Sequence, residues 1–333
     1  MKLLDGLRRR LTRGATVAAL RAGGALGVGP ARSVGLALGR AAHLVPWLRQ
    51  RLTDNLNAAG MDASDSTVKA YFRRLGVWAG HSIGVHKAGF AGSLADMQVE
   101  LDPETLPHLE DAVKRGRGVV VATPHLFCYE FGACLIHRRY PVTAIVRESK
   151  DAAWGAIKHR WYHEQLGINT VFRPRRGSMV GDLGAVLGVL RRGGLLGITP
   201  DVLTSRASGV PVVMFGRTVS LYPGMILLAM RTGAPIVTAS GRWFTDPRAP
   251  GRERARVVFS EPLELSKRGD RDAAVRDGLQ RWCSTFEADL RRAPQDWLFW
   301  LDKAWTKVLQ QPATHPLAHS PAITHPQSNG RAA

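Results

Sequence analysis

The chain has 333 residues, of which 45% are apolar and 22% are charged, and these values exclude a chain that is disordered throughout. The 46 Lys and Arg residues exceed the 27 Asp and Glu residues by 19, which excludes an acidic, solvating protein. Such an excess indicates an anionic partner, namely a nucleic acid, an anionic membrane or a phosphorylated substrate. Three cysteines (Cys128, Cys134 and Cys283) are too few for a disulfide framework, so a reducing compartment is the simpler expectation.

Residues 1–95 are predicted to form a helical, membrane-associating N-terminal region. Residues 1–52 hold ten Lys and Arg and a single Asp. A helix at the start would place leucines on one face and arginines around it, which suits the surface of an anionic membrane. The alternative is a solvated helix that packs on the protein body. We expect no signal peptide, because the basic cluster follows the first leucines and does not precede a long apolar core. We expect no membrane-spanning helix either, because no apolar window reaches about 18 residues. The leucines on the apolar face of the predicted N-terminal helix are Leu3, Leu4, Leu7 and Leu11.

From residue 96 onward, short β-branched runs alternate with helical patterns. The predicted strands are 118–124, 140–148, 168–172, 195–201, 210–216, 234–243 and 254–263, and the predicted helices between them are 131–139, 153–167, 180–194 and 224–233. This alternation predicts an α/β domain over residues 96–310, with a central, mainly parallel sheet flanked by helices. Residues 271–310 are helical and rich in Trp, and Trp297, Trp300 and Trp305 are expected to pack in the core. Residues 311–333 are expected to be a disordered tail.

The first of these strands is followed by a His–x4–Glu spacing. His125 comes directly after the strand and Pro124, at the carboxyl end where open α/β sheets place their ligands. Glu130 should lie in the first turns of the next helix. An imidazole with a carboxylate partner can act as a general base. Cys128 has the surroundings of a core residue, so the nucleophile would be a hydroxyl or amine of the substrate. The alternative is that His125 caps a helix and Glu130 is a surface acid.

The segment TPHLFCYEFG resembles the His–x4–Asp/Glu motif of lysophospholipid acyltransferases. Over residues 40–305 the chain resembles the branch that contains bacterial lipid A late acyltransferases and phosphatidylinositol mannoside acyltransferases. The segments that carry the resemblance, in family order, are AIVRESKD, KHRWYHEQLGINTVF, LRRGGLLGITPD, VPVVMFGRTVSLYPGMILLAMRTGAPIV and RRAPQDWLFW. The resemblance implies a fold like that of glycerolipid acyltransferases.

The resemblance also implies a reaction. His125 would deprotonate a hydroxyl of a membrane glycolipid or lysophospholipid, which attacks an acyl-ACP or acyl-CoA thioester, and Glu130 would orient His125. Arg147 is the first candidate for a cation that stabilises the oxyanion or contacts a phosphate, and Arg160 is the second. Asp201 would orient an arginine or a substrate hydroxyl. The alternatives are structural ion pairs for both arginines and a helix cap for Asp201.

The resemblance implies peripheral association with the cytoplasmic face of the inner membrane and an anionic lipid as the acceptor. We expect no metal, no other cofactor and no nucleic acid. Two other functions remain open. One is a non-catalytic basic module that binds membrane or nucleic acid, and the other is a thioesterase or esterase. A GxSxG pattern at residues 80–84 lies within a helical pattern, whereas a nucleophile elbow needs a strand before its serine.

Overall fold

The computed structural model describes residues 25, 27–93, 99–149, 151–173, 180–245, 253–265 and 270–315. Its centre is a seven-stranded sheet in the order β1-β9-β8-β2-β5-β3-β4, in which only β8 and β9 pair antiparallel. The strands are β1 (Val99–Leu101), β2 (Val119–Ala122), β3 (Val142–Arg147), β4 (Asn169–Arg173), β5 (Leu195–Ile198), β8 (Ile236–Thr245) and β9 (Glu253–Phe259). The predicted mainly parallel α/β sheet is therefore confirmed.

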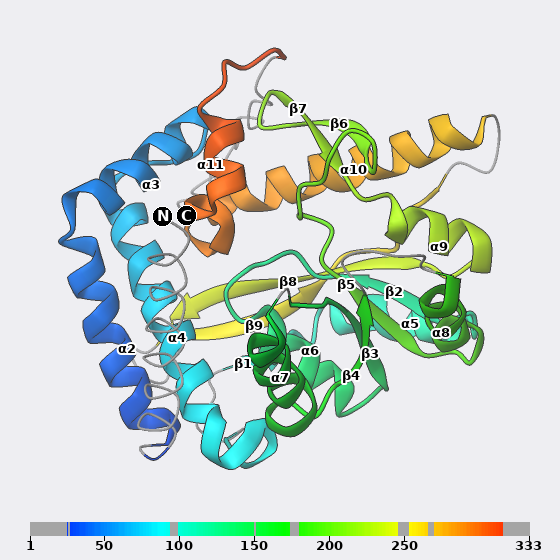
Figure 1. Ribbon diagram of the computed structural model, residues 1–333, viewed down its shortest axis with the longest axis horizontal. Helices are drawn as coiled ribbons and strands as arrows, with labels where there is room; N and C mark the ends of the chain where they lie inside the picture. Colours follow the sequence, from blue (N-terminus) through cyan, green and yellow to red (C-terminus); the bar gives the residue numbers. More distant parts are fainter. Residues whose placement is uncertain are drawn as a thin grey trace, which may run out of the picture.

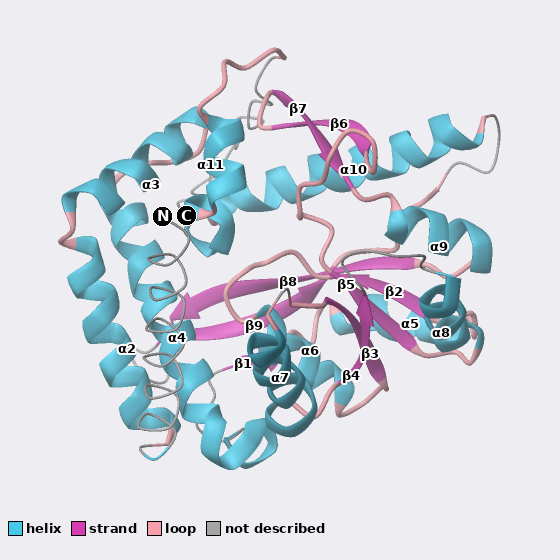
Figure 2. Ribbon diagram, viewed as in Figure 1, coloured by secondary structure: helices cyan, strands magenta, loops and turns pink. Residues whose placement is uncertain are grey.

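Helices cover both faces of the sheet, as Figure 2 shows. They are α2 (Val28–His43), α3 (Pro46–Ala58), α4 (Asp65–Ser93), α5 (Leu106–Lys114), α6 (Tyr129–His137), α7 (Ala152–Arg160), α8 (Val180–Arg191), α9 (Gly224–Thr232), α10 (Arg271–Arg292) and α11 (Lys303–Leu309). A π-helical turn, η1 (Trp161–Gln165), follows α7, and two 3-10 turns, η2 (Pro294–Asp296) and η3 (Leu298–Leu301), follow α10. None of the helices in the described part of the chain is long and apolar enough to span a bilayer.

The central strand β2 is buried on both faces, and its side chains alternate between two cores. Val120 and Ala122 belong to the core formed with α8, α9 and α10, while Val119 and Val121 belong to the core formed with α5 and α6. A strand with two buried faces needs a continuous apolar sequence, and the run of valines supplies it. This burial fixes the position of the loop that follows β2.

The N-terminal helices α2, α3 and α4 stand beside the sheet at the left of Figure 1. Leu52 of α3 and Tyr71 of α4 share one hydrophobic core with β2. The division into a helical region (1–95) and a catalytic domain (96–310) stays a prediction, and the two parts share apolar packing. The amphipathic start expected at residues 1–14 lies outside the described residues.

Helix α4 contains the GxSxG pattern, and glycines along this helix allow it to pack closely against α2. A Cβ added to Gly80 would lie 2.5 Å from the carbonyl oxygen of Ala31, and one added to Gly76 would lie 2.3 Å from that of Gly35. Only glycine permits helices α2 and α4 to approach so closely. Ser82 lies inside the helix, not on a strand-to-helix turn, which agrees with the rejection of a nucleophile elbow.

Two local predictions need correction, the strand at 210–216 and the helix at 153–167. The predicted strand at 210–216 is β6 (Val210–Met214), which pairs with β7 (Arg217–Leu221) in a separate hairpin and not with the main sheet. Phe215 and Gly216 both have positive φ, so they form the two-residue turn that this hairpin needs. The elements β1, α5 and β7 were not predicted from the sequence. The helix expected at 153–167 changes from α-helical to π-helical at Trp161.

The expected tail begins with an ordered contact. The main-chain nitrogens of Thr314 and His315 donate to the carbonyl oxygen of Gly216, and the carbonyl oxygen of Gln311 accepts from Arg217. Residues 316–333 lie outside the described residues, so the prediction of a disordered tail is not tested there.

Candidate active site

His125 and Asp201 follow two paired strands at the same offset. Parallel strands β2 and β5 place Ala122 opposite Ile198. His125 and Asp201 each come three residues later, in the sequences Thr-Pro-His and Thr-Pro-Asp. Because neighbouring parallel strands advance by the same length per residue, equal offsets bring the two residues to the same level of the sheet edge.

The imidazole of His125 is held by the Asp201 carboxylate. His125 Nδ1 lies 2.8 Å from Oδ1 of Asp201, and the main-chain nitrogen of His125 donates to Oδ2 at 2.8 Å. The Asp201 side chain is fully buried, whereas that of His125 is 17% exposed. With Nδ1 bound to a carboxylate as the N–H tautomer, Nε2 carries the lone pair that can accept a proton. A histidine held by a carboxylate in this way has the geometry that general-base catalysis needs.

Two tryptophans surround Asp201. The indole Nε1 of Trp297 donates to Oδ2 of Asp201 at 2.9 Å, and Nε1 of Trp305 donates to the Asp201 carbonyl oxygen at 3.0 Å. Both rings are buried, so the prediction that they pack in the core is confirmed. A buried carboxylate needs donors to replace its water, and these indoles supply them.

The segment around Trp297 also binds the His125 loop through its main chain. Phe127 N donates to the carbonyl oxygen of Asp296 at 2.9 Å, and Leu298 N donates to that of His125 at 2.9 Å. Asp296 is itself paired with Arg74 of α4 in a buried ion pair. Burial raises the pKa of Asp296 to about 7, while the charge and hydrogen bond of Arg74 oppose that shift. The C-terminal segment and α4 thus fix the loop that carries the histidine.

The turn between His125 and α6 is strained. Cys128, the residue before α6, has a φ of 77°, in the left-handed region that a non-glycine residue occupies at a cost of about 1–2 kcal/mol. Its side chain packs against Gly241 of β8, where an added Cβ would lie 2.5 Å from the sulfur. Burial raises the pKa of the Cys128 thiol, which agrees with its prediction as a core residue and not a nucleophile.

Glu130 lies in the first turn of α6, as predicted, and its side chain is buried. Its Oε1 accepts from Nε1 of Trp161 at 3.1 Å and from the hydroxyl of Tyr162 at 3.3 Å. Burial raises the pKa of Glu130, while these donors, the Tyr129 hydroxyl and the charge of His125 work in the opposite direction. The carboxylate that bonds His125 is therefore Asp201, whereas Glu130 bonds Trp161 and Tyr162. A direct role of Glu130 in orienting His125 stays a prediction.

The two predicted arginines lie on the surface of the molecule. Arg147 ends β3 and is exposed, and its carbonyl oxygen accepts from Nζ of Lys158 on α7 at 2.8 Å. Arg160, also exposed, ends α7, where its charge contributes to a lowered pKa of His86 after the larger effect of burial. Arg147 shares the carboxyl edge of the sheet with His125, whereas Arg160 lies near the helix α4.

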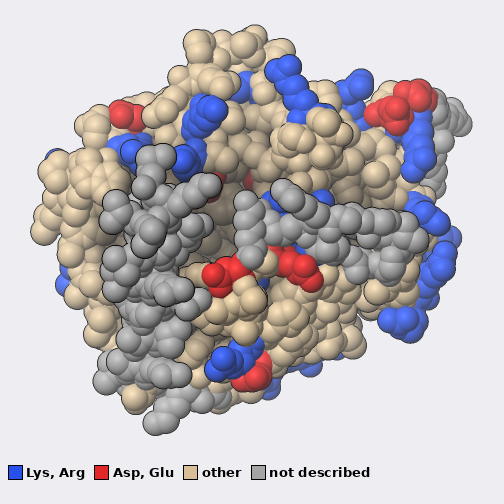
Figure 3. All heavy atoms as spheres, viewed as in Figure 1, with Lys and Arg blue, Asp and Glu red and all other residues tan. Residues whose placement is uncertain are grey.

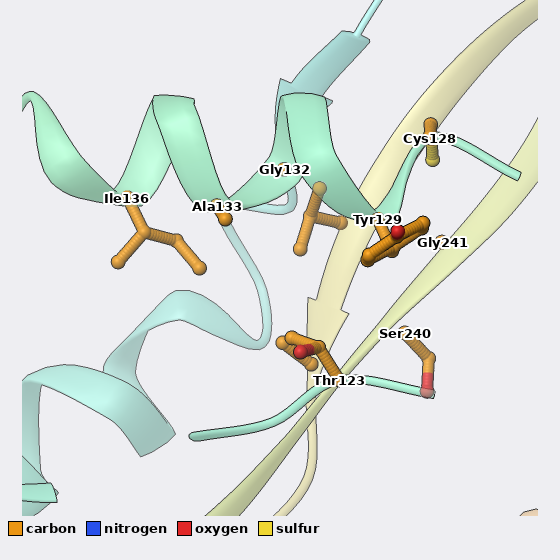
Figure 4. Close-up of a pocket in the computed structure, with 10 residues that line it drawn as sticks. Thr123, Cys128, Tyr129, Gly132, Ala133, Ile136, Ser240 and Gly241 are labelled. Atoms are coloured by element: carbon orange, nitrogen blue, oxygen red, sulfur yellow. The ribbon is translucent and has the colours of Figure 1, made fainter. Parts of the chain in front are cut away.

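A small recess borders the His125 loop between α6 and strands β8 and β9 (Figure 4). It measures about 210 Å³ including its open mouth, below the range of roughly 300–1,000 Å³ that is usual for ligand pockets. Its walls are mixed, with Thr123 and Tyr129 beside apolar residues such as Ile136 and Val257. The recess is therefore too small to hold a whole fatty acyl chain. Among the described residues, no cluster of three or more His, Cys, Asp or Glu could hold a metal ion.

The comparison with protein families decides what this site belongs to. The model of the family described as bacterial lipid A biosynthesis acyltransferase matches residues 10–307. The chain belongs to this family. The resemblance to the lipid A late acyltransferase branch is thereby confirmed, and no curated protein matches the chain at a significant level. Membership in this family identifies the protein as an O-acyltransferase that uses an acyl donor and a lipid acceptor.

Sequence reasoning identified His125 and Asp201 in this acyltransferase but did not join them. The available signal was the repeated Thr-Pro before each residue, at the ends of two strands expected in one parallel sheet. Arg74 and Asp296 were missed, and so was the hydrogen bond of Trp297 to Asp201. These contacts join segments more than 90 positions apart, and no local pattern encodes such a meeting.

Proposed function

We propose that this protein transfers a fatty acyl group from an acyl-CoA or acyl-ACP thioester to a hydroxyl of a membrane glycolipid or lysophospholipid. The acceptor would be of the lipid A type or the phosphoinositide mannoside type. The observation that carries the proposal is the pair of His125 and buried Asp201 at the carboxyl edge of the sheet. A histidine held in this way can activate a hydroxyl without forming a covalent intermediate.

In the proposed reaction, Nε2 of His125 takes the proton of the acceptor hydroxyl while its oxygen attacks the thioester carbonyl. Collapse of the tetrahedral intermediate breaks the C–S bond, and the thiolate leaves with the proton from the imidazolium. Asp201 accepts the hydrogen bond of Nδ1–H throughout and stabilises the imidazolium. The products are an ester and a free thiol, so atoms and charge balance.

The other predicted residues have supporting roles in this proposal. Glu130 stabilises the protonated histidine through space, because each charge favours the charged form of the other. Arg147 is the first candidate for a cation near the oxyanion or a substrate phosphate, since it shares the sheet edge with His125. Arg160 is the second candidate, on the analogy with the family's helix arginine.

We also propose that the protein associates peripherally with the cytoplasmic face of the inner membrane. Helix α2, the turn that follows it and the start of α3 expose apolar side chains, with Leu38 59%, Leu44 74% and Trp47 60% accessible. The guanidinium of Arg51 lies 5.4 Å from the ring of Trp47, so a cation accompanies the aromatic ring. Apolar anchors beside arginines suit an anionic lipid surface. Figure 3 shows Lys and Arg spread over several parts of one face of the molecule, without the single stripe typical of nucleic-acid binding.

The test is thiol release from palmitoyl-CoA and from acyl-ACP, with and without extracted membrane lipid. Wild type is compared with His125→Ala and Asp201→Asn, and acylated lipid is identified by mass spectrometry. Release that depends on added lipid in wild type, and is at least about 100-fold slower in His125→Ala, supports the proposal. Circular dichroism checks that each variant remains folded.

Each other outcome has a definite meaning. Thiol release that does not depend on lipid would identify a thioesterase, with water as the acceptor. Absence of release with either donor and the full lipid extract would favour a non-catalytic binding module. Transfer by His125→Ala near the wild-type rate would exclude His125 as the base.

Membrane association is tested separately by sedimentation with vesicles that contain anionic lipid. Deletion of residues 1–14 and the substitution Trp47→Ser should each weaken binding, and the deletion should remove the salt-sensitive part. Binding that is insensitive to salt in the wild type would contradict an electrostatic contribution.

A further inference from the structure

Two arginines stand side by side at the edge of the sheet. Arg147 ends β3 and Arg173 ends β4, and the two are paired in the parallel register of these strands. Like charges directly opposite on neighbouring strands repel each other and destabilise a sheet. The fold maintains this repulsion at the edge where α/β sheets bind their ligands.

Tyr222, which follows β7, links the two charges. The guanidinium carbon of Arg173 lies 4.5 Å from the centre of the Tyr222 ring. The pKa of the Tyr222 hydroxyl is lowered, mainly by its hydrogen bond with Thr204 and then by the charges of Arg173 and Arg147, so both charges reach the same hydroxyl. An aromatic face holds a cation in place without neutralising it.

Among the ion pairs formed within the described residues, none includes Arg147 or Arg173. Two arginines on neighbouring strands that form no ion pair within the described residues, beside a tyrosine hydroxyl that can donate, have the chemistry that binds phosphate.

The strand order places this cluster at a definite distance from the histidine. His125 follows β2, and β5, β3 and β4 come next in that order. Neighbouring strands lie about 4.8 Å apart, so Arg147 and Arg173 lie roughly 10–15 Å from His125 along the sheet edge. A phosphate bound there could belong to the same molecule as the group that reacts at His125.

We propose that Arg147, Arg173 and Tyr222 form a phosphate-binding site for a phosphate ester of the substrate. The inference rests on the proposed acyl transfer for the identity of that substrate. Two sources share the chemistry, namely the pantetheine phosphate of the thioester donor and a phosphate in the head group of the lipid acceptor. The sources differ in which substrate loses affinity when Arg173 is removed.

The first experiment measures binding without catalysis. Isothermal titration calorimetry compares 4′-phosphopantetheine with pantetheine as donor probes, and inositol 1-phosphate with inositol as acceptor probes. Arg173→Gln removes one cation of the site. Arg138→Gln removes an exposed cation next to the last residue of α6, at the opposite edge of the sheet, and serves as the matched control.

We expect wild type and Arg138→Gln to bind one of the phosphate probes at least 10-fold more tightly than its phosphate-free counterpart. Arg173→Gln should lose most of that preference, because a charge-assisted hydrogen bond is worth about tenfold or more in affinity. Loss with phosphopantetheine identifies the donor as the source, and loss with inositol 1-phosphate identifies the acceptor. A wild type that prefers neither phosphate, or a variant with unchanged preference, overturns the inference.

The second experiment separates this site from the proposed function. In the thiol-release assay, Arg173→Gln should raise the KM of the phosphate-bearing substrate about 10-fold and change kcat little. If wild type binds a phosphate probe but releases no thiol, the proposed function fails and the binding site stands. If transfer proceeds and neither KM changes in the variant, the site fails and the proposed function stands.

Discussion

Replacing Trp297 with Phe would remove one hydrogen-bond donor from the carboxylate that orients His125 and keep an aromatic ring in place. The lost bond is that of Nε1 to Oδ2 of Asp201, at 2.9 Å in a buried position. Hydrogen bonds to charged groups contribute about 1.5–3 kcal/mol. Oδ2 keeps a second donor, the main-chain nitrogen of His125, so the lower half of that range applies.

A loss of about 1.5–2 kcal/mol in the transition state corresponds to a decrease of roughly 10–30-fold in kcat. KM should change little, because Trp297 is fully buried and so offers no surface to a substrate. The assay is thiol release from palmitoyl-CoA in the presence of membrane lipid, with kcat and KM measured separately.

Trp305→Phe is the matched control for this variant. Trp305 is equally buried, and its indole donates to the main-chain oxygen of Asp201 and not to the carboxylate. Both substitutions lose the same ring volume and one N–H group, so their difference isolates the donor to the carboxylate. If Trp297→Phe and Trp305→Phe have the same kcat, or if Trp297→Phe matches wild type, the reasoning about Asp201 is refuted.

Three further variants test burial and packing. Glu130→Gln should slow transfer and should stabilise the fold more at pH 8 than at pH 4. Because burial raises the pKa of Glu130, the folded protein binds the proton of this carboxyl group more tightly than the unfolded chain does, and wild type loses stability as the pH rises. Equal gains in stability at both pH values would contradict this. Burial lowers the pKa of His81 to about 4, so the free energy of unfolding of wild type should fall by up to about 3 kcal/mol between pH 6.5 and pH 4. Urea titrations should show a smaller fall for His81→Leu. Gly76→Ala should destabilise the α2–α4 contact by about 1–3 kcal/mol. Gly184→Ala in α8 should be neutral or stabilising, because among the described residues no atom beyond its own helix lies within 4 Å of the added Cβ. Equal melting temperatures for the two alanine variants would show that α2 and α4 can separate without cost.

The sequence predicted those parts of the site that depend on one element and its neighbours in the chain. The valine run of β2 specified a buried strand, and Pro124 ended it, so the position of His125 at the carboxyl end could be predicted. Glu130 could likewise be placed in the first turn of a helix. The hairpin of β6 and β7 was not anticipated, because whether a strand joins the main sheet depends on its partner and not on its own pattern.

The sequence alone therefore determined the fold class, and it placed His125 at the carboxyl edge of the sheet, where the chemistry is proposed to occur. Only the tertiary structure decided which carboxylate the histidine uses. Glu130 is closer in the chain, but its Oε1 is bound by Trp161 and Tyr162, whereas Asp201 arrives through the pairing of β2 with β5. Strand order and register are set by packing over the whole chain, and a spacing of five residues cannot encode them.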